Sequence, residues 1–107
     1  MKITLISGAG SGIGLSIAEE FYKNGHSLVL LVKNKTQKTK LTKIFNIKRT
    51  RIFSGDLSNY NYTKKLSSKV KFVHNIINNA ATRNDDHFLR VKRKDLDHII
   101  DLNFKKI

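Results

Sequence analysis

The chain has 107 residues with no cysteine and no proline, so it holds at most one domain and lacks both a disulfide framework and a thiolate metal site. No apolar run approaches the roughly 20 residues that span a bilayer, and no secretory signal follows Met1-Lys2, so we expect no membrane contact and a cytoplasmic, reducing location. The 21 Lys and Arg residues outnumber the 8 acidic residues, and the net charge of +13 favours anionic partners such as nucleic acid or an acidic protein.

The first predicted element is an apolar strand, residues 3–6, which leads through a glycine-rich turn into a helix. Glycines let the main chain approach a diphosphate, and the first amides of the helix direct the positive end of its dipole at the anion. The spacing G-x-x-x-G-x-G therefore predicts a phosphate-binding turn, although such turns also occur without a ligand. Its predicted cofactor-binding residues are Gly8, Ala9, Gly10, Ser11, Gly12, Ile13 and Gly14.

The elements that follow alternate between short β-branched runs and helical patterns. Strands are predicted at residues 28–32, 51–53 and 72–77. Helices are predicted from Ile13 to Asn24-Gly25, over residues 36–45, from Ser58 as N-cap through Val70, and from about Lys94 onward. This alternation predicts an α/β fold with a Rossmann-like doubly wound parallel sheet in the order 3-2-1-4, truncated after the fourth strand and its following helix.

Cofactor choice is expected to depend on the end of the second strand, where a carboxylate binds a ribose 2′-hydroxyl and a basic residue accepts a 2′-phosphate. Lys33-Asn34 stands there, with further lysines behind it and no carboxylate. We therefore expect Lys33 to bind the phosphorylated cofactor, NADP(H). A solvated lysine at a strand end is the alternative interpretation.

Several stretches resemble the classical short-chain dehydrogenase/reductase family. Residues 7–14 are similar to its Thr-Gly-x-x-x-Gly-x-Gly signature, Asn78-Asn79-Ala80-Ala81 to its Asn-Asn-Ala-Gly motif, and residues 97–103 to the segment that holds its helix asparagine. The resemblance implies that Asp56 and Leu57 contact the adenine ring, that Asn79, Ala80 and Ala81 lie at the cofactor, and that Asn103 has a catalytic role in organising a water and the catalytic lysine. Ordinary structural roles also explain these residues: Asp56 as the cap of a helix or turn, Asn79 as a turn-forming asparagine, and Asn103 as a polar residue at a helix end.

Within the family, residues 79–92 look most like the 3-oxoacyl-(acyl-carrier-protein) reductases of bacterial fatty-acid synthesis, with a basic stretch after the asparagine motif. That resemblance implies hydride transfer from NADPH to a ketone, and an acidic acyl carrier protein as partner. Arg83, Arg90, Lys92 and Arg93 would attract this partner electrostatically. A solvated basic loop explains the same residues.

The family's catalytic serine, tyrosine and lysine have no counterpart in their expected context. Tyr60 and Lys64 match Tyr-x-x-x-Lys, but on the helix between the third and fourth predicted strands, away from the nicotinamide end. We therefore expect this chain alone to be a catalytically inactive cofactor-binding half that pairs with a C-terminal fragment or with further copies of itself.

Two other hypotheses remain open. The first is a degenerate nucleotide-binding module whose positive charge binds nucleic acid or an acidic protein. However, the basic residues are scattered along the chain, and no aromatic residue interleaves with their densest run, 33–40. We therefore expect no dedicated nucleic-acid surface. The second is a chain without a stable fold. The histidines His26, His74, His87 and His98 share no metal-ligand spacing, so no metal is predicted.

Overall fold

Strands and helices alternate along residues 2–79, the part of the chain that this computed structural model describes. The elements are β1 (Ile3–Ser7), α1 (Gly12–Lys23), β2 (Ser27–Val32), α2 (Lys35–Ile44), β3 (Thr50–Ser54), α3 (Tyr60–Lys69) and β4 (Asn75–Asn78). The strands form one parallel sheet with the order β3-β2-β1-β4, in which Leu5 of β1 is level with Val29 of β2 and Ile76 of β4. The predicted doubly wound order is confirmed.

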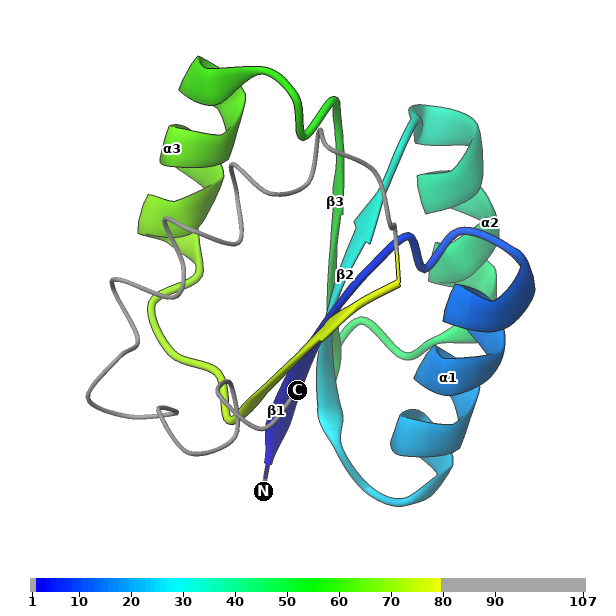
Figure 1. Cartoon of the computed structure of the whole chain (residues 1–107). Helices are drawn as coiled ribbons and strands as arrows, with labels where there is room; N and C mark the ends of the chain where they lie inside the picture. The colour runs from blue at the N-terminus through cyan, green and yellow to red at the C-terminus, as the bar shows by residue number, and fades with distance from the viewer. Residues whose placement is uncertain (1, 80–107) are drawn as a thin grey trace.

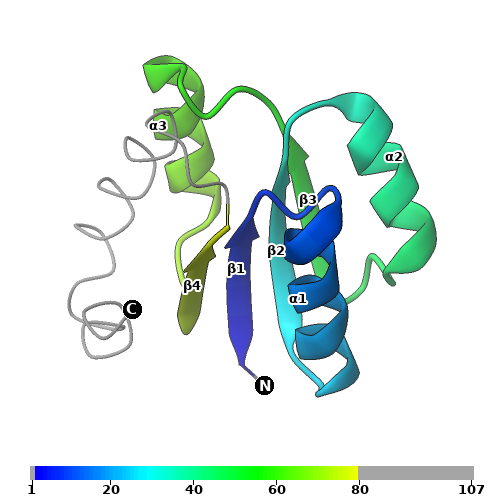
Figure 2. The same ribbon diagram turned by 45° about the vertical axis from the view of Figure 1, so that its right-hand side comes forward.

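The sheet is the middle layer of the fold, with α1 and α2 on one face and α3 on the other (Figure 1, Figure 2). Side chains of a strand alternate between its faces, so a strand that is covered on both faces must be apolar throughout. In β2, Leu28, Leu30 and Val32 pack under α1 and α2, whereas Val29 and Leu31 pack under α3. This double burial explains why the sequence of β2 is a continuous apolar run.

The turn after α1 forms as predicted. Gly25 has φ 89°, a left-handed conformation that glycine adopts without steric cost, and its N–H donates to the carbonyl oxygen of Tyr22 at 3.1 Å. His26 then donates its N–H to the carbonyl oxygen of Phe21 at 3.1 Å. The chain thereby reverses direction and enters β2 beside β1.

The start of the third helix differs from the prediction. Asn59, not Ser58, is the N-cap of α3, and its side chain accepts a hydrogen bond from the N–H of Tyr62 at 3.0 Å. Ser58 is already engaged by the preceding turn, because its N–H and its hydroxyl both donate to Asp56 Oδ1. The predicted cap residue therefore belongs to the turn that leads into the helix.

The fourth strand is shorter at its start than the predicted range 72–77. It begins at Asn75 because β1 begins at Ile3, and the register between the two strands pairs Thr4 with Asn75. His74 bridges the gap: its N–H donates to the carbonyl oxygen of Ile3 at 2.8 Å, and its Nδ1 accepts from the N–H of Ile3 at 2.9 Å. Phe72 precedes this contact and is exposed.

A last helix and the absence of a membrane span are also expected from the sequence. The helix predicted from Lys94 lies outside the described residues, so it stays a prediction. Within residues 2–79, none of the helices combines the length and the apolar character that crossing a membrane requires.

Candidate functional site

The glycine-rich turn lies at the carboxyl end of β1, between that strand and α1 (Figure 2). Gly8 and Gly12 have φ 64° and 59°, in the left-handed region that other residues enter only at a cost of about 1–2 kcal/mol. Between them, the N–H of the buried Ala9 donates to the carbonyl oxygen of Leu31 at 3.3 Å. The turn is thus bonded to β2, and the two left-handed glycines allow the main chain to fold tightly above the sheet.

Gly14 brings the start of α1 against the turn and against the end of β4. A Cβ added at Gly14 would lie 2.6 Å from Asn79 Nδ2 and closer still to the carbonyl oxygen of Gly8. Asn79 Nδ2 donates to that same carbonyl oxygen at 3.1 Å. One strand position earlier, the hydroxyl of the buried Ser7 donates to Asn78 Oδ1 at 2.9 Å. These contacts hold the ends of β1 and β4 and the start of α1 in one arrangement.

The N-terminus of α1 is built differently from those of α2 and α3. Asn34 and Asn59 cap α2 and α3 by accepting hydrogen bonds from the N–H groups of Gln37 and Tyr62. Ser11, the N-cap of α1, makes no such side-chain bond, and the first turn of α1 contains no acidic residue. Its amides and the positive end of its dipole are therefore available to an anion, which is the chemistry that a diphosphate requires.

Lys33 follows β2 at the same edge of the sheet. Its side chain is exposed, and its N–H donates to Gln37 Oε1 at 3.1 Å. Gln37 was not among the residues predicted from the sequence. Its side chain lies against Gly10, where a Cβ would contact the carboxamide. No local pattern could have indicated this contact, because it joins the first turn of α2 to a loop more than twenty positions earlier.

Asp56 and Leu57 follow β3, whose end is bonded to β2 through the Gly55 N–H and the carbonyl oxygen of Val32 at 3.0 Å. Hydrogen bonds from the hydroxyl and the N–H of Ser58, in that order of strength, lower the pKa of the exposed Asp56 carboxyl. Leu57 is half-buried and packs on the core under α3. Asp56 Oδ1 thus accepts the two hydrogen bonds that hold this turn, whereas Oδ2 accepts no hydrogen bond from the described residues.

Tyr62 fixes the other side of this turn. Its hydroxyl donates to the carbonyl oxygen of Ser54 at 2.8 Å, and burial raises the pKa of that phenol. Its ring fills the space where a Cβ on Gly55 would lie. Tyr60 and Lys64, which match Tyr-x-x-x-Lys, lie nearby on α3. This helix starts after β3, and β3 and β4 are the two outer strands of the sheet.

The structure therefore brings most of the predicted residues to one edge of the sheet. The glycine turn, Lys33, Asp56 with Leu57, and Asn79 each follow the carboxyl end of a different strand. Their roles in cofactor binding stay predictions. Ala80, Ala81 and Asn103 lie outside the described residues, as do Arg83, Arg90, Lys92 and Arg93.

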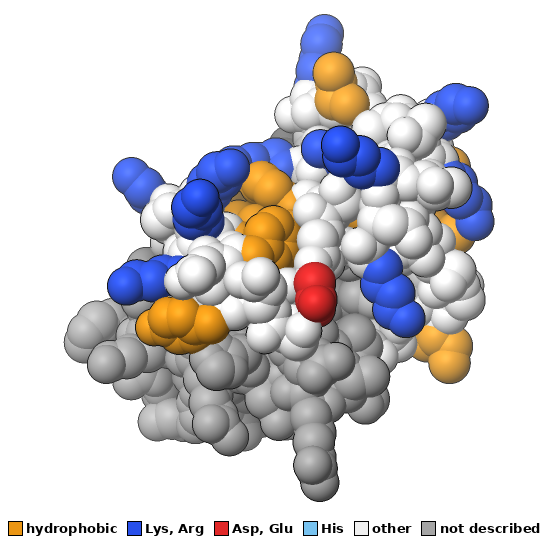
Figure 3. All heavy atoms as spheres, turned by 90° about the horizontal axis from the view of Figure 1, so that it is seen from above, with side chains coloured by type: hydrophobic (Ala, Val, Ile, Leu, Met, Phe, Trp, Pro, Cys, Tyr) orange, Lys and Arg blue, Asp and Glu red, His pale blue; other side chains and the backbone are white. Residues whose placement is uncertain are grey.

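The face at this edge is strongly basic. Seen from above, Lys and Arg side chains are spread around the described part of it, with hydrophobic side chains and an acidic side chain between them (Figure 3). Among residues 2–79 the acidic residues are Glu19, Glu20 and Asp56, and Asp56 alone follows the carboxyl end of a strand. Such a surface attracts anionic ligands and raises their association rates.

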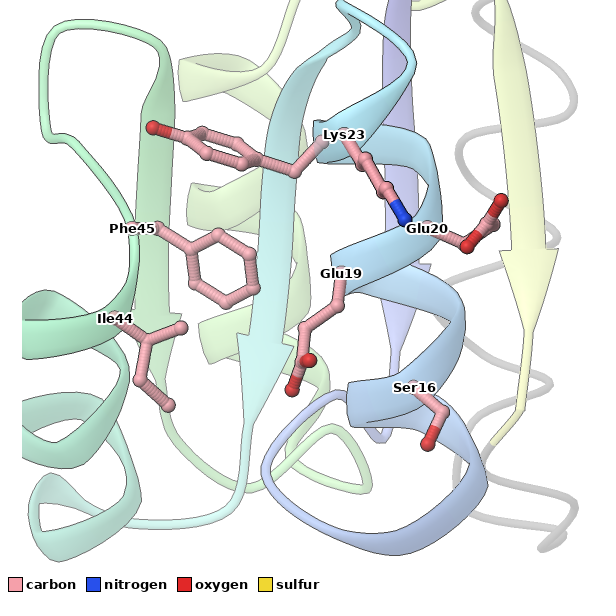
Figure 4. Close-up of a pocket in the computed structure, with 7 residues that line it drawn as sticks. Ser16, Glu19, Glu20, Lys23, Ile44 and Phe45 are labelled. Carbon is pink, nitrogen blue, oxygen red and sulfur yellow. The ribbon is translucent and has the colours of Figure 1, made fainter.

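A groove of about 380 Å³ lies elsewhere, between α1 and the end of α2. Ile44 and Phe45 face α1 across it, and Glu19 extends from α1 on their side, whereas Ser16 and Glu20 extend from the other side of the helix (Figure 4). The remaining lining residues, Tyr22 and Lys23, belong to the last turn of α1. Because α1 runs away from the glycine turn, most of this groove is remote from the edge that carries the predicted site.

Comparison with known proteins identifies the relatives of this chain. The 3-oxoacyl-(acyl-carrier-protein) reductase of Rickettsia prowazekii is 32% identical over 104 residues, which are 97% of this chain and 43% of that protein. The structure of L-sorbose reductase from Gluconobacter frateurii, complexed with NADPH and L-sorbose, matches with a TM-score of 0.64 and 28% identity over 76% of this chain and 34% of that one.

A structure described as a short chain dehydrogenase/reductase family protein matches with a TM-score of 0.77 and 17% identity, and it covers 89% of this chain and 49% of that one. The chain thus spans less than half the length of each of these relatives. The family model for short chain dehydrogenases matches residues 2–107. The chain belongs to the short-chain dehydrogenase family, whose members are oxidoreductases that use nicotinamide cofactors.

Proposed function

We propose that this chain binds NADPH, with the diphosphate at the glycine turn and the first amides of α1. The contact at Gly14 carries this proposal, because it is a close approach of main chain that only glycine permits, in the first turn of a helix whose N-cap side chain makes no hydrogen bond. Asn79 supports the turn from the end of β4 by its bond to Gly8. When bound, NADPH would supply the hydride, and these residues would hold and orient it.

The preference for NADPH over NADH is proposed from charge. Lys33 stands at the end of β2, where the adenosine ribose of a dinucleotide binds in this type of fold. An ammonium group attracts a 2′-phosphate, whereas a 2′-hydroxyl is bound by a carboxylate. The NADPH in the sorbose reductase structure is consistent with this choice.

The substrate is proposed from the relatives. Similarity to 3-oxoacyl-(acyl-carrier-protein) reductases suggests reduction of a ketone on an acidic carrier protein, and the basic face around the site would attract such a partner. Tyr60 and Lys64 lie on α3, which follows the edge strand β3 in the chain and covers the face of the sheet opposite α1. The proton donor for the ketone would therefore come from outside this chain, in a C-terminal part of the enzyme or another subunit.

Calorimetric titration of the full chain with NADPH and with NADH tests the cofactor assignment. We expect tighter binding of NADPH, and Lys33→Glu should weaken it by about tenfold or more, because the substitution reverses a charge beside a phosphate. Lys43→Glu is the control, since it makes the same change in an exposed residue in the last turn of α2. No NADPH binding, together with salt-dependent binding of DNA or RNA, would instead support the nucleic-acid module.

A further inference from the structure

The side chain of Gln37 occupies the space between the glycine turn and the end of β2. Its Oε1 accepts the N–H of Lys33 at 3.1 Å, and its own N–H donates to Asn34 Oδ1 at 2.9 Å. The side chain is therefore folded back from α2 toward the strand that precedes it. The cap bond fixes the main chain of Gln37, and the bond from the Lys33 N–H holds its carboxamide.

Gly10 is the other neighbour of this carboxamide. A Cβ at Gly10 would lie 2.8 Å from Gln37 Nε2, and closer to Cδ and Oε1. Gly10 is buried between the buried Ala9 and the exposed Ser11, and the Gln37 carboxamide lies against it. The absence of a side chain at Gly10 thus makes room for the Gln37 amide in addition to any ligand.

The Nε2 group of Gln37 retains its donor capacity. A carboxamide nitrogen carries two N–H donors. The Oε1 atom is used by Lys33, and Nε2 makes no hydrogen bond to any of residues 2–79. These donors lie between the diphosphate turn and Lys33, which is where an adenosine ribose sits when a dinucleotide spans the end of β2.

We propose that Gln37 is a specificity-determining residue that donates hydrogen bonds from Nε2 to the 2′-phosphate of the adenosine ribose, beside the charge of Lys33. This inference rests on the proposed function. Gln37 supplies the directed hydrogen bonds and Lys33 supplies the positive charge. The bond from the Lys33 N–H engages Oε1, so the atom of the carboxamide that remains for a ligand is the donor Nε2.

Gln37→Glu is the sharpest test, because a carboxylate still accepts the N–H of Lys33 but replaces the donors with a negative charge. The full chain is titrated with adenosine 2′,5′-bisphosphate and with adenosine 5′-monophosphate, and the ratio of the two dissociation constants is compared. In the original chain the bisphosphate binds more tightly. In Gln37→Glu this preference falls by about tenfold or more, since bonds to charged groups are lost and repulsion is added.

Gln37→Met provides a second variant that keeps the length of the side chain without either polar group, and it should reduce the same preference less than Gln37→Glu does. Asn46→Asp is the charge-matched control: it retains the acceptor for the N–H of Lys48, beyond the far end of α2, and should leave the preference unchanged. Thermal unfolding of each variant verifies that it is folded.

The outcomes separate the two proposals. If the original chain binds both adenosine ligands, and Gln37→Glu and Gln37→Met keep its preference for the bisphosphate, the assignment of Gln37 is wrong while the proposed function stands. Equal weakening of both ligands would also overturn it, because that result indicates a structural role. If the original chain binds neither adenosine ligand nor NADPH, the proposed function fails, and the role of Gln37 fails with it.

Discussion

Asn79 and Gly14 show how single residues shape the proposed site. The Asn79 carboxamide donates to the carbonyl oxygen of Gly8, and the bare Cα of Gly14 faces both groups. The three residues come from the position after β4, from α1 and from the turn after β1, so their contact fixes three segments at once. A side chain at Gly14 would have to displace main chain, which is far less adaptable than the end of a flexible side chain.

Gly14→Ala should therefore lower both stability and cofactor affinity. Overpacking of a tight contact costs about 1–3 kcal/mol, and we expect the free energy of unfolding to fall by that amount in urea titration. The affinity for NADPH should fall as well, because the turn must shift away from α1. Ser16→Ala, in an exposed position of the same helix, is the control and should leave both quantities nearly unchanged. Normal NADPH affinity in a stable Gly14→Ala variant would contradict the role of this contact.

At the scale of elements, Arg49 joins the end of α1 to the connection between α2 and β3. Its Nη2 donates to the carbonyl oxygens of Tyr22 at 2.8 Å and His26 at 3.0 Å, and its guanidinium lies 4.1 Å from the centre of the Tyr22 ring. The carbonyl groups at the end of a helix need such partners. Arg49 thereby sets the position of α1 relative to β2 from the edge opposite the glycine turn.

Arg49→Met should destabilise the fold by about 1–3 kcal/mol, because two half-buried carbonyl oxygens lose their donor. Arg51→Met is the matched comparison. Arg51 is exposed, bonds the carbonyl oxygen of Lys69 at 3.1 Å and should cost about 0.5 kcal/mol. Urea titrations of both variants measure the difference, and equal losses would show that the Arg49 bonds contribute no more than an exposed arginine does.

The elements themselves could be predicted from local patterns, whereas the contacts between them could not. Apolar runs and glycine spacing were sufficient for the strands and for the turn at Gly25, because these depend on neighbouring residues. The strand order followed from the alternation of strands and helices, since connections between parallel strands are right-handed. The start of β4 could not be placed, since it depends on the register with Ile3, far away in the sequence. Gln37 was missed for the same reason: a helix residue shows no sequence pattern when its partner is a distant glycine such as Gly10.

At the scale of the whole molecule, the sheet order places the site at the reversal point. β1 lies between β2 and β4, and the connection from β1 to β2 runs through α1 on one face of the sheet, whereas the connection into β4 runs through α3 on the other face. Ligands of doubly wound sheets bind in the crevice at this point. The basic face around it adds long-range attraction for a ligand that carries several phosphates. Fold, local geometry and charge thus favour the same edge.

The most direct test of the cofactor site is a titration of the ¹⁵N-labelled full chain with NADPH, followed by the chemical shifts of its backbone amides. Our account predicts the largest changes in residues 8–14 and at Lys33, with much smaller changes at the far ends of α1 and α2. Binding that leaves the amides of residues 8–14 unchanged while amides elsewhere shift would contradict the central claim.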